Sequence, residues 1–269
     1  MTPVAVSEGA GPLVLAFPHT GTFLPKTVWS KLNPLGLELA DTDWHVDQLY
    51  DGLLPGATTV RALFHRYVID ANRDPDGGSL YPGQNTTGLV PGCTFDGEAI
   101  WREVPDATEI AQRTSDWHAP YHAALAEQLE RVRRQHGVAI LFDCHSIRSN
   151  ISFLFSGLLP DLNLGTNDGQ SCATVLQHCA VRHLSAAPGF THAVNARFKG
   201  GWTTRHYGQP ENRVHAIQLE LAQRTYLDTE APPFAFDQAK AARLRAVLGP
   251  LLAELVQLAP ALAQSGDPA

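Results

Sequence analysis

The order of apolar and amphipathic segments constrains this fold most. Short apolar runs typical of β-strands alternate with segments whose apolar residues recur at helical spacing. The strand-like runs lie at 12–17, 58–64, 66–71, 138–143 and 215–221. The helix-like segments lie at 43–54, 108–118, 121–137, 171–184 and 236–259. Because strands separated by helices form parallel pairs with both faces covered, we expect a three-layer α/β/α fold with a mostly parallel mixed sheet, built as one domain over residues 1–269.

Composition favours a globular protein and excludes some partners. The 269 residues are 44% hydrophobic and 17% charged, below the usual charged share of about 25%. The net charge of −7 argues against a nucleic-acid surface. The most apolar window, 247–263, holds two prolines, a Glu and a Gln, so we expect a packed amphipathic helix and not a membrane span.

The location of the protein is predicted from the lack of a secretory signal and from the spacing of the cysteines. No charged leader precedes an apolar segment, and none of the four cysteines forms a C-x-x-C pair. We therefore expect reduced thiols and a cytoplasmic protein. Cys144 stands between Asp143 and His145, so on a strand it faces the opposite side and is expected to be a buried structural thiol.

One long segment lacks the periodicity of a helix or strand. Residues 74–106 are rich in Gly, Pro, Asn and Thr. Because a plain connector in a compact domain is rarely this long, we expect a functional lid or a wall of the site.

Polar side chains follow or interrupt the apolar runs. In open α/β sheets ligands bind beyond the carboxyl ends of the strands, so these residues are the candidates for a site. They are His19, Asp70, Asn72, Arg73, Asp143, His145, and Glu220 on the same strand face as Gln218.

These residue types match a hydrolytic zinc site. Such a site takes three nitrogen or oxygen ligands from the protein and leaves one position for water. His19 and His145 can supply two imidazoles, and Glu220 is a candidate base for the water proton. Asp143, two residues from His145, is a candidate structural or outer carboxylate.

The third ligand is open at this stage. The stretch "DTDWHVD" offers Asp41, Asp43, His45 and Asp47 within seven residues, and on a helix Asp43 and Asp47 share a face. The alternative is ordinary helix capping, with Asp41 or Asp43 as the cap and the other acids in the first turn.

Two arginines in loop-like contexts point to an acidic substrate. Arg73 and Arg205 are suited to bidentate carboxylate binding, although surface ion pairs explain either one alone. Phe17, Trp44 and Trp202 are candidate walls of a tight pocket or, equally, core residues.

Other catalytic motifs lack support. The "HAPYH" stretch at 118–122 has the histidine spacing of a zinc protease, but no Glu follows its first His and Pro120 is expected to break the turn. No G-x-S-x-G, P-loop or G-x-G-x-x-G motif occurs, so serine-hydrolase and nucleotide-binding functions lack their main support.

As a set, several motifs resemble a known family. They are "FPHTGTFLP", "DTDWHVDQLYD", "RYVIDANRDP", "TTGLVP", "FDCHSI", "GGWTTRHYG" and "IQLELAQRTYL", spread over residues 12–228. Together they resemble the N-formylglutamate amidohydrolases, which are distantly similar to zinc carboxypeptidases and aspartoacylases. The resemblance implies a phosphorylase/hydrolase-like fold of the zinc carboxypeptidase kind.

The resemblance also implies roles for individual residues. His19 and His145 would be metal ligands, Asn72 and Arg73 the substrate-binding pair, and Glu220 the base. Arg73 would assist at the oxyanion or at a carboxylate.

One position departs from the pattern of the distant relatives. Thr22 stands three residues after His19, where they carry a glutamate ligand. The resemblance points to Asp43 as its replacement, with Asp47 as the alternative.

The expected function is zinc-dependent hydrolysis of N-formyl-L-glutamate to formate and L-glutamate in histidine degradation. We expect one Zn²⁺ per chain and a small dicarboxylate substrate, with no nucleic acid and no membrane as partners. One alternative is a deacylase for another N-acyl amino acid. Another is a non-catalytic small-acid binding protein on the same fold, against which Glu220 argues because binding alone needs no base.

Overall fold

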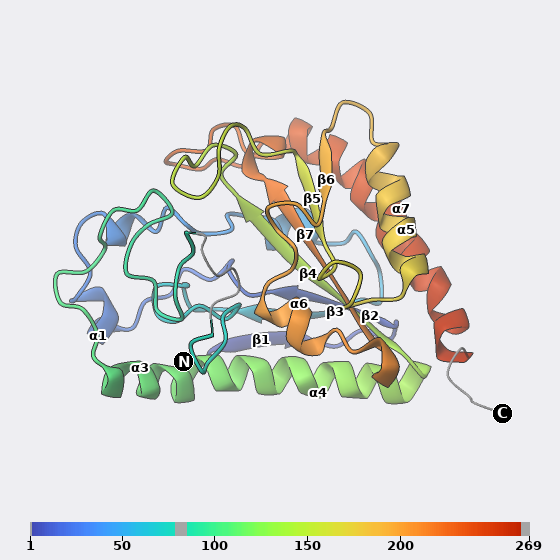
Figure 1. Ribbon diagram of the computed structural model, residues 1–269, viewed down its shortest axis with the longest axis horizontal. Coiled ribbons are helices and arrows are strands. Elements are labelled where there is room, and N and C mark those ends of the chain that lie inside the picture. The colour runs from blue at the N-terminus through green and yellow to red at the C-terminus, as the bar shows by residue number, and fades with distance from the viewer. Residues whose placement is uncertain (1, 79–84, 265–269) are drawn as a thin grey trace.

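The computed structural model describes residues 2–78 and 85–264, and within them one mixed sheet of seven strands forms the centre of the molecule (Figure 1). Its spatial order is β1-β3-β2-β4-β7-β5-β6. The strands are β1 (Val4–Ser7), β2 (Leu13–Phe17), β3 (Thr58–Ala62), β4 (Ala139–Ile147), β5 (Leu162–Gly165), β6 (His192–Val194) and β7 (Val214–Ala222).

The middle of the sheet is parallel. Strands β3, β2, β4 and β7 pair in parallel, whereas β1 is antiparallel to β3 and β5 is antiparallel to β7. Strand β6 pairs in parallel with β5. The carboxyl ends of the four central strands therefore point to the same edge, where the candidate site residues were expected.

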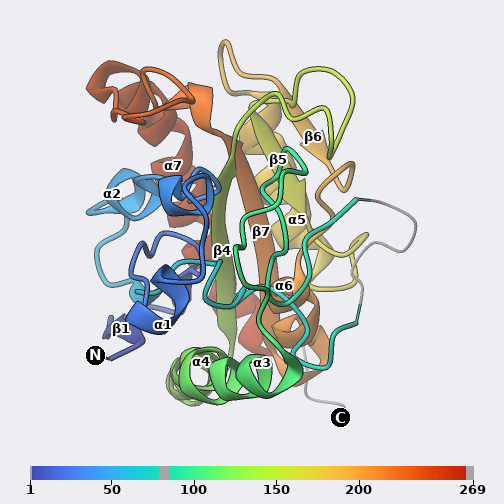
Figure 2. The same ribbon diagram turned by 90° about the vertical axis from the view of Figure 1, so that its left-hand side faces the viewer.

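Helices cover both faces, so the three-layer prediction is confirmed. The helices are α1 (Lys26–Trp29), α2 (Val46–Tyr50), α3 (Ala107–Arg113), α4 (Ala119–His136), α5 (Thr174–Ser185), α6 (Trp202–Tyr207) and α7 (Gln238–Gln264). Helix α4 runs along one face and α5 with α7 along the other (Figures 1 and 2). Alternate residues of β2 enter different layers: Leu13 and Leu15 pack towards α7, and Val14 packs towards α4.

Helix α7 is longer than expected. It includes Pro250 and Pro260 within a single helix, and its apolar stripe packs into the core beside the sheet. Among the described residues it is the one helix that is long and apolar enough to span a membrane. This is weak evidence for a membrane span, because core helices of soluble proteins can be equally long and apolar. The prediction of a packed amphipathic helix fits its contacts better.

Two local predictions are wrong. Residues 66–71 form a turn and not a strand, because the Asp70 side chain accepts a hydrogen bond from the Asn72 amide and bends the chain there. The segment 43–54 is helical only over α2, because His45 adopts the left-handed conformation with φ 58° and prevents an earlier start. Three short strands, β1, β5 and β6, were not anticipated.

The cysteine predictions agree with the structure. All four cysteines are free thiols. Cys144 is fully buried on the face of β4 opposite Asp143 and His145, and burial raises its pKa well above the usual value. A neutral buried thiol is unsuited to nucleophilic chemistry.

Candidate active site at the carboxyl edge of the sheet

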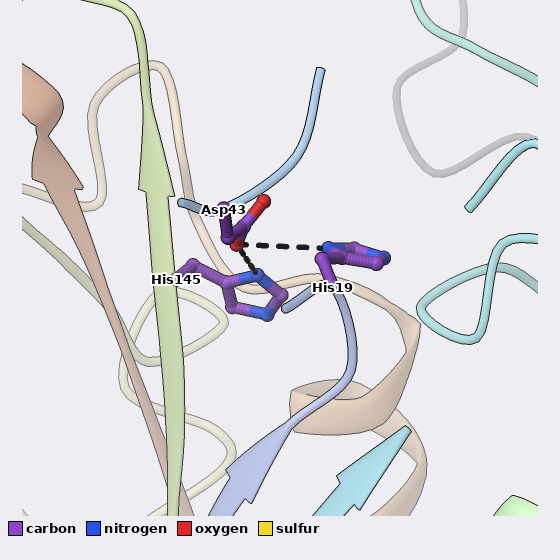
Figure 3. A group of neighbouring side chains, drawn as sticks. All are labelled: His19, Asp43 and His145. Atoms are coloured by element: carbon purple, nitrogen blue, oxygen red, sulfur yellow. Dashed lines mark hydrogen bonds and ion pairs between the residues drawn. The ribbon is translucent and has the colours of Figure 1, made fainter. Parts of the chain in front are cut away.

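Two histidines and an aspartate converge near the carboxyl edge of the central strands. His19 follows β2, His145 lies on β4, and Asp43 belongs to the segment before α2. Figure 3 shows the Asp43 carboxylate between the two rings. Asp43 Oδ2 lies 3.1 Å from His145 Nδ1 and 3.8 Å from His19 Nδ1. All three side chains are buried.

The donor set fits a divalent metal ion. The potential ligand atoms of the three residues lie within 4.8 Å of one another. His19 Nδ1 is buried and has no hydrogen-bond partner among the described residues. A buried polar atom without a partner costs free energy, so such atoms usually have a ligand or a donor beside them. A cation bound by two imidazoles and a carboxylate would satisfy it, in the combination typical of catalytic zinc.

The outer nitrogen of each imidazole faces its own carboxylate. His19 Nε2 lies 2.7 Å from Asp70 Oδ1. His145 Nε2 lies 3.1 Å from Asp143 Oδ2 and 3.0 Å from the side-chain nitrogen Nδ2 of Asn72. A carboxylate beside the outer nitrogen favours a proton there and leaves the inner nitrogen to ligate. Asp143 therefore lies where an outer carboxylate was predicted, and Asp70 provides the equivalent contact for the other ring.

Asp43 is held from two further directions. Its Oδ1 accepts a hydrogen bond of 2.8 Å from Arg66 Nη2, and its Oδ2 accepts one of 3.0 Å from the Ser146 amide. Burial alone would raise the pKa of Asp43, but Arg66 and the two imidazoles lower it below the usual value. The carboxylate is thus ionised and fixed in place.

The alternatives for the "DTDWHVD" stretch can now be compared. The capping interpretation is wrong for Asp43 and Asp41, because no side chain caps α2 and Asp41 instead accepts hydrogen bonds from Tyr67 and Phe95. Asp47 forms an ion pair with Arg61 and lines a different cavity. The exposed side chain of Thr22 does not contribute to the cluster.

Glu220 lies beside the cluster on the neighbouring strand. It is the register partner of His145 in the β4–β7 pair, and its carboxylate accepts a hydrogen bond of 3.3 Å from Gln218, which confirms their common face. Both strands continue beyond these residues, so the polar groups interrupt the strands and do not end them. Burial raises the pKa of Glu220 to about 7, although His145 and Arg66 act in the opposite direction.

A cavity of about 70 Å³ opens onto these groups. The lining residues are His19, Arg66, Asn72, Arg73, Thr86, Thr87, Phe95, His145, Ser146, Ile147, Leu154, Arg197, Phe198, Gly201, Gln218 and Glu220. Thr86, Thr87 and Phe95 come from the segment 74–106, so the part of that segment that the structure describes contributes a wall, as predicted; residues 79–84 lie outside the described part.

The arginines of the cavity differ from those expected. Asn72 and Arg73 line it, but Arg205 does not: its Nε donates to the Gly200 carbonyl at the start of α6. Arg66 and Arg197 line the cavity instead. Sequence reasoning missed both because Arg66 lay within a supposed strand and nothing near Arg197 marked a site.

Of the two alternatives for the aromatic residues, the wall interpretation is wrong for all three, and the core interpretation holds for Phe17 and Trp44. Phe17 is in the core, Trp44 stacks on Phe234, and Trp202 packs against histidines outside the cavity. The apolar lining is provided by other side chains, namely Ile147, Phe95, Leu154 and Phe198.

Fold and site together define an α/β protein with a histidine–carboxylate cluster at the carboxyl edge of its parallel strands. Comparison with known proteins gives the family: residues 11–227 match the model for N-formylglutamate amidohydrolase. The chain belongs to the N-formylglutamate amidohydrolase family, which confirms the resemblance of its motifs.

Two curated relatives and one solved structure are similar over nearly the whole chain. The N-formylglutamate deformylase of Pseudomonas aeruginosa is 46% identical over 256 residues, which cover 94% of this chain and 96% of the relative. That of Pseudomonas putida is 44% identical, with 93% and 94% covered. The crystal structure of N-formylglutamate amidohydrolase from Ralstonia eutropha JMP134 superposes with a TM-score of 0.79 at 28% identity, covering 96% and 98%.

Proposed function

We propose that this protein hydrolyses N-formyl-L-glutamate to formate and L-glutamate with the help of one divalent metal ion, zinc by the chemistry of its donors. The observation that carries the proposal is the buried cluster of His19, Asp43 and His145, whose two histidines line the same cavity as Glu220. The names of the two curated relatives support the substrate.

Three side chains would hold the metal. Nδ1 of His19, Nδ1 of His145 and a carboxylate oxygen of Asp43 face one another, while Asp70 and Asp143 fix the rings from outside. A bound zinc ion supplies Lewis acidity towards the formyl oxygen and makes its water a nucleophile near neutral pH.

Glu220 would carry the proton. As the base it accepts a proton from the water whose oxygen adds to the formyl carbon, and it then donates that proton to the amine nitrogen as the carbon–nitrogen bond breaks. A carboxyl group with a pKa of about 7 can perform both transfers at neutral pH. The buried position of Glu220 favours catalysis over a purely binding function.

Arginines on two walls of the cavity would bind the two carboxylates of the substrate. Arg73 is oriented by hydrogen bonds from its Nε and Nη2 to Thr87, and Arg197 by one of 3.0 Å from its Nε to the Leu154 carbonyl. Arg73 Nη1 also lies 3.9 Å from Asp70 Oδ2. Arg66 has the closer anionic neighbours, with Asp43 Oδ1 at 2.8 Å from its Nη2 and Asp70 Oδ2 at 3.8 Å from its Nη1.

Within the cell, we place this activity in the cytoplasm and in histidine degradation, where N-formylglutamate would be the substrate. Four free thiols fit a reducing compartment.

Formate release tests the proposal directly. Purified protein mixed with N-formylglutamate should release formate and glutamate in equal amounts, chelation should abolish the reaction, and added zinc should restore it. Wild-type, zinc-loaded protein that releases no formate would overturn the proposed function.

A further inference from the structure

The backbone on both sides of Asn72 is held by histidine side chains. His122 Nε2 lies 2.8 Å from the Ala71 carbonyl oxygen, and His118 Nε2 lies 3.0 Å from the Arg73 carbonyl oxygen. Because a carbonyl only accepts, each Nε2 must carry the donated proton. The two rings thus fix the peptide groups that flank Asn72, a residue whose side chain lines the cavity.

The helix geometry brings the two rings to one side. His118 ends a π-helical turn, Thr114–His118, and His122 lies in the first turn of α4. Their ring centroids are 4.3 Å apart. Pro120 does not break the helix as expected, because it occupies the first turn of α4, where its missing N–H has no partner to lose. Single π turns within helices are uncommon and often occur at functional sites.

Helix α6 completes the brace from the other side. The Thr203 amide donates to Asn72 Oδ1 at 2.8 Å, and Trp202 packs edge-on against His122 with centroids 4.6 Å apart. The hydroxyl of Tyr207 lies 3.1 Å from His122 Nδ1. Two motifs far apart in the sequence, "HAPYH" and "GGWTTRHYG", therefore surround the same short segment.

We propose that His118 and His122 are positioning residues, which hold the Ala71–Arg73 backbone so that Asn72 and Arg73 face the carboxylates of the substrate. The inference rests on the proposed function and adds to it two residues, His118 and His122, that would touch neither the substrate nor the metal. Burial lowers the pKa of both rings, that of His122 to about 3, so they donate as neutral groups and do not compete with Arg73 for an anion.

Paired substitutions separate positioning from simple packing. His118→Phe and His122→Phe keep an aromatic ring but remove the donor, whereas His118→Gln and His122→Gln keep a donor at a similar reach. His215→Phe is the matched control, because His215 is also buried and hydrogen-bonded, to the Ala173 amide, but lies outside the cavity.

Each Phe variant should raise KM for N-formylglutamate and the Kd for L-glutamate by about tenfold, the size of effect that corresponds to losing about 1.4 kcal/mol. The Gln variants should recover most of this loss. Metal content, measured by elemental analysis, should stay at the wild-type value throughout, and His215→Phe should lower only the melting temperature.

Two outcomes would overturn the inference. In one, the Phe variants keep the wild-type KM and Kd and lose only thermal stability, like His215→Phe. In the other, the Gln variants are as defective as the Phe variants, so the donated hydrogen bond is not the cause. If the wild-type protein binds glutamate but releases no formate, only the proposed function is rejected, because the Kd values of the variants still test the positioning role. If the wild-type protein does not bind glutamate, the proposed function and the positioning role are both rejected.

Discussion

At the scale of single residues, the choice of metal ligands depends on which aspartate reaches the two imidazoles. Asp43 lies between the rings, whereas Asp47 is paired with Arg61. We therefore predict that Asp43→Ala and His145→Ala lose most of the bound zinc, while Asp47→Ala keeps about one ion per chain. Elemental analysis after dialysis measures this, and an Asp43→Ala protein with full metal occupancy would contradict the assignment.

Glu220 gives a second prediction at this scale. Glu220→Gln preserves shape and the contact with Gln218 but cannot accept a proton. Turnover should fall by about 10²-fold or more, as is typical when a general base is removed, while zinc content stays unchanged. Near-normal turnover would show that another group is the base, and Asp143 would then be tested by the same amide substitution.

At the scale of elements, the four central strands were predictable, whereas the short strands β1, β5 and β6 and the turns were not. The apolar flanks and the period of two place Asp143 and His145 on one face of β4 from local sequence alone. Whether Asp43 or Asp47 reaches the two histidines depends instead on the left-handed conformation of His45, and no helical pattern in the sequence reveals that conformation. Arg197 reaches the cavity only through the packing of distant segments, so no local signal marks it.

The start of α6 offers a prediction about an element. A Cβ atom on Gly201 would lie only 2.3 Å from the side-chain nitrogen Nδ2 of Asn72. Gly201→Ala should therefore displace Asn72 and raise KM for N-formylglutamate, with no loss of metal. Gly249→Ala inside α7 is the control, because its added methyl meets only Leu53 at 3.7 Å and should stabilise the helix by about 0.5–1 kcal/mol. An unchanged KM for Gly201→Ala would show that Asn72 does not bind substrate.

At the scale of the whole molecule, the cavity combines walls from several distant segments and should select its substrate by charge and size. Formylated apolar amino acids should fail because they leave Arg73 or Arg197, both partly buried, without a carboxylate of the substrate. An added methyl in a tight pocket costs about 1–3 kcal/mol, so N-acetylglutamate should react about ten- to two-hundred-fold more slowly than N-formylglutamate. The measurement is kcat/KM for these two substrates, N-formylaspartate and N-formylleucine. Equal values for N-formylleucine and N-formylglutamate would identify a broader deformylase.

Two buried histidines outside the metal cluster, His122 and His215, should each destabilise the fold on mild acidification, whereas Glu220 with its raised pKa acts in the opposite direction. Burial lowers the pKa of His122 to about 3 and that of His215 to about 4, against 6.5 for an unshielded histidine. Below pH 6.5 the unfolded chain therefore binds protons that the folded chain refuses, and stability is lost progressively as pH falls towards the folded pKa values. Each ring should reduce the free energy of unfolding by about 1.3 kcal/mol between pH 7.5 and pH 5.5. Urea unfolding of wild type and His215→Phe at the two pH values isolates one ring, because the change in the free energy of unfolding should differ between the two proteins by about 1.3 kcal/mol. An identical pH dependence in wild type and His215→Phe would mean that His215 titrates normally in the folded protein.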